Sequence, residues 1–367
     1  MTQDQLAQLQ WMVLGATGLV SVFLGALMHR THFCTMGAVS DAVVMQNFDR
    51  LRQWALALVV ALLGFGGMTF AGLISPLKSI YATPAVYWLS SLLGGLLFGW
   101  GMVLSSGCGV KSLVRLGAGN LKSFVVLLVM GVTALMTMKG VLAMPRVHFI
   151  EQITWTPVQG VFVGQWISYY YQVDLGLGAF VAAAAGSLFL SVWIFKDRRF
   201  LTLFNVGTGL SVGLVICAFW LISGVWGHGM EHPDTLEEFF LATSSRKMEA
   251  LSTTAPVAMI LDSLMYFSDG TKRMTLGMMS VLCICMGAFI SANVSGNFKV
   301  EAFVSKSDLS RHLMGGCLMG VGAVLAMGCS VGQGLSGLST FSLASLLASL
   351  GILIGAYVAL WRDLQQA

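Results

Sequence analysis

Nine apolar stretches with few or no charges run through the chain, and they restrict its fold more than any other feature. The stretches are 11–28, 54–74, 86–105, 124–144, 175–195, 203–226, 275–294, 313–327 and 341–360. Most of them approach the roughly 20 residues that a helix needs to cross a hydrocarbon core about 30 Å thick. With 56% hydrophobic and 10% charged residues, the composition excludes an ordinary soluble domain. The sequence therefore predicts an all-α polytopic membrane protein with about nine transmembrane helices in one transmembrane domain, residues 1–367.

The distribution of lysine and arginine predicts the orientation of the chain. Nine spans place the loops after spans one, three, five and seven on the same side as the C-terminus. That side carries 13 of the 20 basic residues, and basic loops are retained in the cytoplasm. We expect a multi-pass protein of the bacterial inner (plasma) membrane, with a periplasmic N-terminus and a cytoplasmic C-terminus.

An internal repeat divides the sequence. Residues 94–110 (GGLLFGWGMVLSSGCGV) and 315–331 (GGCLMGVGAVLAMGCSV) agree at ten of 17 positions at a fixed offset of 221. The repeats extend approximately over 11–144 and 203–361, with the span 175–195 as an odd connector between them. An odd connector inverts the second unit. The sequence thus predicts two inverted pseudo-symmetric repeats, related by an axis in the membrane plane, with a site near the midplane between them.

Both matching segments end in a Gly-Cys motif, and glycine- or serine-rich sequence follows, so a membrane helix breaks there. Irregular backbone at membrane depth is tolerated where it packs in protein or lines a polar cavity. A half-helix that restarts after the break points N–H groups and a positive dipole end at the cavity, which suits an anion. The thiols suit a soft, sulfur-bearing anion. The candidate pathway residues of the two motifs are Gly107, Cys108, Gly109, Gly328, Cys329, Ser330 and Gly332.

The alternative interpretation of the two cysteines is that they are small residues at helix contacts, where free cysteine is often buried. Their recurrence at the same place in both halves favours the pathway interpretation.

A third candidate thiol is Cys34, in the sequence Arg-Thr-His-Phe-Cys after the first span. Its equivalent at the offset of 221 is Ala255, so this thiol is not duplicated. An amphipathic segment at 34–48 is predicted to form a short re-entrant or interfacial half-helix, with 256–267 as its counterpart. From these residues alone, a role for Cys34 in the pathway stays open.

Two aspartates, Asp41 and Asp262, also recur at the offset of 221. Ionisable groups at membrane depth are costly and usually functional, so both are candidate proton sites. The favoured interpretation is structural, because both lie near predicted loop ends. There they are expected to cap helices or to pair with Arg52 and Arg273.

Two basic residues follow the first motif, Lys111 and Arg115, and their equivalents in the second half are Gly332 and Ser336. Because the charges are not duplicated, they are expected to set topology. They are also candidates for attracting an anion at the cytoplasmic mouth.

The Phe-Cys motif and the two Gly-Cys motifs together resemble the YeeE/YedE family, also called the sulphur transport domain family, over residues 11–361. The resemblance implies an inner-membrane permease of the thiosulfate-uptake type, with an hourglass shape and opposed re-entrant helices. It assigns Cys108 and Cys329 to a constriction and Cys34 to the family's Phe-Cys motif. It also implies a further thiol in the second half, for which Cys283 and Cys285 are candidates.

The predicted protein is a transporter and not an enzyme. It is expected to take up a small sulfur-containing anion, with thiosulfate as the favoured substrate. The anion is relayed past successive thiols, with binding weak enough for release. A cytoplasmic sulfur carrier or rhodanese-like protein is a partner that the resemblance suggests. No cofactor, metal or nucleic acid is expected, since the cysteines lack the paired spacing of a structural zinc site.

Three alternatives stay open. One is transport of another sulfur or selenium species. Another is a membrane sulfur relay that carries a persulfide on Cys108 or Cys329, which needs a thiolate. The third is a channel for small neutral solutes, in which the thiols would be dispensable.

Overall fold

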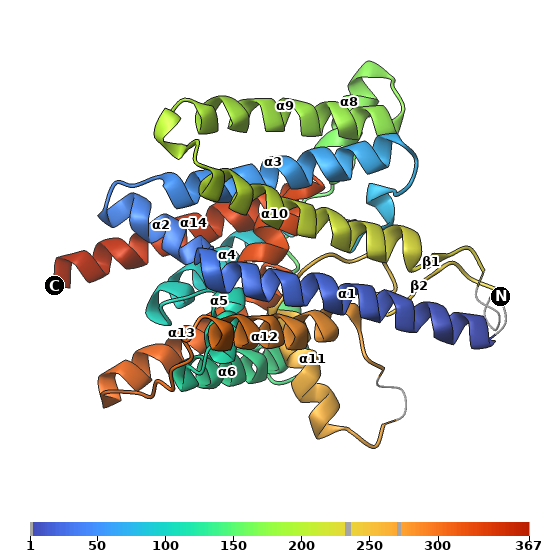
Figure 1. Cartoon of the computed structure of the whole chain (residues 1–367). Coiled ribbons are helices and arrows are strands. Elements are labelled where there is room, and N and C mark those ends of the chain that lie inside the picture. Colours follow the sequence, from blue (N-terminus) through green and yellow to red (C-terminus); the bar gives the residue numbers. More distant parts are fainter. Residues whose placement is uncertain (1–2, 232–235, 270–272, 367) are drawn as a thin grey trace.

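Helices make up almost all of the regular structure in the computed structural model, which describes residues 3–231, 236–269 and 273–366 (Figure 1). The α-helices are α1 (Gln3–Thr31), α2 (Thr35–Val44), α3 (Asp49–Phe70), α4 (Trp88–Leu104), α5 (Gly109–Gly117), α6 (Leu121–Met138), α7 (Ala143–Pro145), α8 (Val163–Tyr171), α9 (Leu175–Phe195), α10 (Leu203–Leu221), α11 (Thr254–Met265), α12 (Leu276–Val294), α13 (Lys306–Leu325) and α14 (Leu343–Gln366). The short 3-10 and π-helical turns are η1 (Pro76–Lys78), η2 (Arg146–Ile150), η3 (Arg198–Phe200), η4 (Ile222–Trp226) and η5 (Gly332–Gly337). The strands are β1 (His228–Gly229) and β2 (Phe239–Phe240), which pair antiparallel.

The predicted all-α membrane fold is confirmed. Within the described residues, eight segments are long and apolar enough to cross a membrane: Asp4–Val44, Asp49–Phe70, Trp88–Gly117, Leu121–Met138, Leu175–Phe195, Leu203–Trp226, Leu276–Val294 and Leu343–Gln365. The remaining predicted span, 313–327, lies mostly on α13. This helix has 20 residues, but Lys306, Asp308 and Arg311 in its first two turns make it less apolar than the other eight. The two marked ends of the chain lie on opposite sides of the molecule (Figure 1).

Glycines let the central helices approach closely. α4 packs against both α13 and α14, and α13 packs also against α6. A Cβ on Gly101 of α4 would lie 2.7 Å from the Gly315 carbonyl oxygen, and a Cβ on Gly315 would lie 2.7 Å from the Gly101 carbonyl oxygen. Small residues at such crossings replace a side-chain layer with backbone contact, which is how helices pack tightly in membranes. The glycine-rich sequence of both repeats therefore fixes the crossing that carries the two Gly-Cys motifs.

The two Gly-Cys motifs break their helices with the same backbone turn. α4 ends at Leu104 and α13 at Leu325, which are equivalent at the offset of 221. Ser106 and Met327 follow in the left-handed region, with φ of 54° and 57°. The N–H groups of Gly107 and Gly328 then donate to carbonyls five residues earlier, at 2.9 and 2.8 Å. This pattern is a Schellman cap, and it ends each helix just before its cysteine.

A half-helix follows each cap, and the two differ by one residue. The first half-helix is α5, and the second covers residues 330–339 and includes the π-helical turn η5. α6 begins at Leu121, whereas α14 begins at Leu343, one residue later than the offset of 221 predicts. A π-helical turn accommodates one extra residue, and such turns are frequent at functional sites.

The predicted short helices at 34–48 and 256–267 correspond to α2 and α11, whose last residues, Val44 and Met265, are again equivalent at the offset of 221. The connections before these two helices differ. His32, Phe33 and Cys34 join α1 to α2, whereas a long loop from Gly227 to Thr253 precedes α11. Because of this loop, the second half carries a segment next to its cysteine that the first half lacks.

Candidate functional site

Cys329 lies at the start of the second half-helix, and two groups donate hydrogen bonds to its sulfur. Thr253 Oγ1 is 3.2 Å and the Gly332 backbone nitrogen 3.3 Å from Cys329 Sγ. Ser252 Oγ lies 4.0 Å from the same sulfur. Cys329 is 1% exposed, and a sulfur that accepts from two donors is free to direct its own S–H elsewhere.

Cys108 is the N-cap residue of α5, and it is as deeply buried as Cys329. Its thiol faces the thiol of Cys34 and the hydroxyl of Ser330. Cys34 in turn is the N-cap residue of α2 and is buried. The structure therefore brings Cys34, Cys108 and Ser330 together, although they come from distant parts of the chain.

Thr253 connects the two Gly-Cys motifs. Besides its bond to Cys329, its hydroxyl oxygen would lie 2.7 Å from a Cβ placed on Gly109, the first residue of α5. The backbone at Gly109 can approach this closely because glycine has no Cβ. The starts of both half-helices therefore meet at one hydroxyl group.

Two cavities flank the cysteines. One, of about 240 Å³, is lined by Tyr81, Ser252, Ala255, Met327 and Gly328, among others. The other, of about 520 Å³, is lined by Ser106, Lys111, Arg115 and several more polar residues. Since Ser106 and Met327 are the equivalent left-handed residues of the two motifs, each cavity adjoins one of the two Schellman caps. The lining of the first cavity also includes Glu249, and we call this cavity the Tyr81 vestibule; we call the second the basic vestibule.

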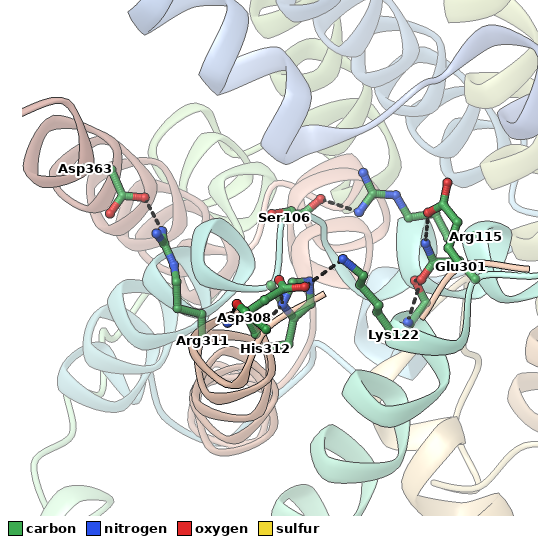
Figure 2. Close-up of polar contacts among 12 residues, drawn as sticks. Ser106, Arg115, Lys122, Glu301, Asp308, Arg311, His312 and Asp363 are labelled. Atoms are coloured by element: carbon green, nitrogen blue, oxygen red, sulfur yellow. Dashed lines mark hydrogen bonds and ion pairs between the residues drawn. The ribbon is translucent and has the colours of Figure 1, made fainter. Parts of the chain in front are cut away.

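Figure 2 shows the charged groups around the basic vestibule. Lys122 pairs with Asp308 at 2.7 Å, and the Asn120 side chain donates to Glu301. Outside the cavity lining, Arg311 pairs with Asp363 at 2.6 Å, which ties α13 to the end of α14. Both carboxylates of the vestibule are thus matched to polar partners from α6 or the residue before it.

Lys111 and Arg115 are the cations of the basic vestibule closest to the first cap. Arg115 donates to the Ser106 carbonyl oxygen at 2.9 Å, as Figure 2 shows. Lys111 is half-buried behind Cys108, and in the described part of the chain no carboxylate lies within ion-pair distance of its ammonium group. An ammonium without a carboxylate beside two buried thiols is an attractive position for an anion.

The two aspartates lie in the last turns of α2 and α11, away from the caps that precede the cysteines. Asp41 pairs with Arg50 at 3.3 Å, and Asp262 pairs with Lys139 at 3.2 Å. The expected partner of Asp41, Arg52, pairs instead with Asp197 at 2.8 Å. The helix that follows α2 turns the Arg52 side chain toward the loop after α9.

Cys283 and Cys285, the candidates for a further thiol, lie on α12 at helix contacts. The Cys285 thiol donates to the Leu113 carbonyl oxygen of α5 at 3.4 Å. Cys283 packs against α1, where a Cβ on Gly18 would lie 3.4 Å from its sulfur.

Sequence reasoning missed three hydroxyl-bearing residues near Cys329, namely Ser252, Thr253 and Tyr81. The Tyr81 hydroxyl donates to the Gly332 carbonyl oxygen, and burial raises the pKa of Tyr81, which keeps this donor protonated. None of the three belongs to a motif in the sequence. The run Ser-Thr-Thr before Pro256 was the available signal, since serine and threonine favour helix starts.

Comparisons with known proteins relate this chain to transporters of sulfur compounds. A family described as Sulphur transport matches residues 30–358. The thiosulfate transporter TsuA of Escherichia coli (strain K12) is 27% identical over 355 residues, which cover 94% of this chain and 93% of that protein. The thiosulfate transporter TsuA of Spirochaeta thermophila (strain ATCC 700085 / DSM 6578 / Z-1203) is 24% identical over 371 residues, which cover 94% of this chain and 98% of that protein.

Proposed function

The chain belongs to the sulphur transport family, and on this premise we propose that it is a permease that takes up thiosulfate through a constriction lined by Cys34, Cys108 and Cys329. The observation that carries the proposal is the meeting of both Gly-Cys motifs at the Thr253 hydroxyl, between the two vestibules. The names of the two relatives support thiosulfate as the anion.

A doubly charged anion that loses its hydration shell needs hydrogen-bond donors and positive charge in its place. Each half-helix offers N–H groups and a positive dipole end at its start. The thiols are weak, polarisable donors that match the terminal sulfur of thiosulfate. Lys111 adds a full positive charge on the side of Cys108. Since thiols bind weakly, the anion can pass from one to the next and leave.

The two halves are proposed to be inverted repeats, so that the Tyr81 vestibule and the basic vestibule open on opposite sides of the membrane. Three features support this: the matching Schellman caps, the matching ends of α2 and α11, and the location of the termini on opposite sides of the molecule (Figure 1). The excess of lysine and arginine favours a cytoplasmic basic vestibule and C-terminus in the inner membrane. A cytoplasmic sulfur carrier or rhodanese-like protein would then receive the anion there.

A sulfur relay is the second candidate function, because Cys329 directly precedes the second half-helix, and reactive cysteines are often found at helix starts. The thiolate would attack the terminal sulfur of thiosulfate, form a persulfide and release sulfite as the leaving group. Intact-mass measurement after exposure to thiosulfate separates the functions, since a relay adds one sulfur atom to the protein and a permease adds none.

The test of the permease uses a bacterium that lacks its own sulfur-anion uptake systems and carries this protein with a C-terminal fluorescent fusion. Growth on thiosulfate is expected with the native protein and with Cys317→Ala, and no growth with Cys329→Ala. Cys317 is a matched control because it lies on α13, on the other side of the helix break from Cys329.

Fluorescence of the fusion reports both expression and a cytoplasmic C-terminus, because the reporter folds only there. A fluorescent membrane with no growth of the native strain on thiosulfate would exclude that substrate, and other sulfur and selenium anions would then be screened. Growth with Cys329→Ala equal to the native protein would instead support a channel that does not use the thiols.

A further inference from the structure

Thr253 is the best-placed polar side chain between the two half-helices, and it is fully buried. Its hydroxyl donates to Cys329 Sγ at 3.2 Å and adjoins the backbone of Gly109, beside Cys108. A hydroxyl hydrogen rotates freely about its C–O bond. The same group can therefore donate to the sulfur or to an atom that arrives between the two motifs.

Ser252 extends this polar surface toward the Tyr81 vestibule, which it lines. Its hydroxyl lies 4.0 Å from Cys329 Sγ. The preceding residue, Leu251, accepts a hydrogen bond from the Ser336 hydroxyl of η5 at 2.9 Å. This contact holds the segment 251–253 against the second half-helix, so the two hydroxyls have a fixed position next to the thiol.

The hydroxyls differ in chemistry from the thiols around them. A hydroxyl is a stronger hydrogen-bond donor than a thiol, and its bond to a charged oxygen is stronger than a bond between neutral groups. Thiosulfate has two kinds of end, one terminal sulfur and three oxygens that share negative charge. The thiols Cys34 and Cys108 match the first kind of end, and Ser252 and Thr253 match the second.

We propose that Ser252 and Thr253 form an oxygen subsite that binds the sulfonate oxygens of the anion while the thiols hold its terminal sulfur, and that Thr253 determines specificity for such two-ended anions. This inference rests on the proposed thiosulfate permease. As the anion enters, the Thr253 hydroxyl turns from Cys329 Sγ to an oxygen of the substrate. Cys329 keeps the Gly332 N–H as a donor and directs its own S–H to the terminal sulfur.

The test measures initial rates of labelled thiosulfate uptake into membrane vesicles for Thr253→Val, Thr253→Ser and the control Thr254→Val. Valine keeps the shape of threonine and removes the donor, whereas serine keeps the donor. Thr254 is also buried, but its hydroxyl faces Met130 Sδ at 3.7 Å. We expect Thr253→Val to raise KM about tenfold or more, the loss of one hydrogen bond to a charged group. Thr253→Ser and Thr254→Val should retain the native KM.

A purely structural role of Thr253 would lower the amount of protein and the maximal rate of Thr253→Val without changing its KM. An unchanged KM in Thr253→Val, at native protein levels, therefore overturns the proposal. If Thr253→Val does not reach the membrane, Gly109→Ala replaces it, since its methyl group would displace the Thr253 hydroxyl. A raised KM in Gly109→Ala supports the subsite, and a native KM overturns it. Absence of uptake by the native protein is a different result, because it rejects the permease itself.

Discussion

The half-helix that begins after Cys108 and the one that begins after Cys329 start from the same left-handed turn but have different surroundings. The first is a regular α-helix with Lys111 in its first turn, and its cysteine faces another thiol. The second contains a π-helical turn with Gly332 at the equivalent position, and its cysteine faces hydroxyls. A shared backbone turn therefore positions both cysteines, while the neighbouring segments decide the chemistry that each one meets.

The largest expected effect tests the charge difference between the half-helices. Replacement of Lys111 by Met should lower thiosulfate uptake into vesicles about fivefold or more, because a nearby unit charge contributes about 1–4 kcal/mol to holding an anion. Lys122→Met is the matched control, since Lys122 lines the same vestibule but is paired with Asp308. Equal losses in the two variants would mean that the general charge of the vestibule matters and the position of Lys111 does not.

An intermediate effect tests how rigidly each half-helix is packed. A Cβ on Gly117 of α5 would lie 2.4 Å from the Cys285 backbone oxygen, whereas a Cβ on Gly337 of η5 would meet the side-chain oxygens of Ser345 and Gln333. Side-chain ends can move and a helix backbone cannot. Gly117→Ala should therefore destabilise the protein by about 1–3 kcal/mol, and Gly337→Ala by less. Melting temperatures in detergent measure both losses of stability. A larger loss in Gly337→Ala than in Gly117→Ala would show that the π-helical turn is the more rigid element.

The smallest effect concerns the long loop that distinguishes the second half. The Lys78 ammonium, with His228 as a second partner, holds the pKa of Glu238 below its usual value. A lowered folded-state pKa contributes stability above the unfolded-state pKa, and this contribution is lost as the pH falls through the folded-state value. Glu238→Gln should thus lower the free energy of unfolding by less than about 1 kcal/mol near neutral pH, as expected of an exposed pair, and should not change it in acid. Melting curves recorded near neutral pH and in acid, with Glu237→Gln as control, check this prediction. A loss of stability in Glu238→Gln that persists in acid would contradict it.

The sequence alone determined the membrane fold and the position of the helix breaks. Long apolar stretches leave a chain no alternative to membrane helices. The identity of residues 94–110 with residues 315–331 at ten positions indicated where two breaks with a shared function would lie. Both conclusions depend on local pattern, so one sequence was sufficient for them.

The tertiary structure decided which side chains meet at the cysteines. Thr253 and Ser252 reach Cys329 because the long loop after η4 folds back against η5, and nothing in their local sequence marks that contact. Arg52 pairs with Asp197 for the same kind of reason, since its partner lies after a helix far along the chain. Hydrogen bonds and ion pairs between distant residues depend on how helices cross. The sequence therefore specified the thiols of the site, and the packing of the two halves supplied its hydroxyls and its unpaired charge.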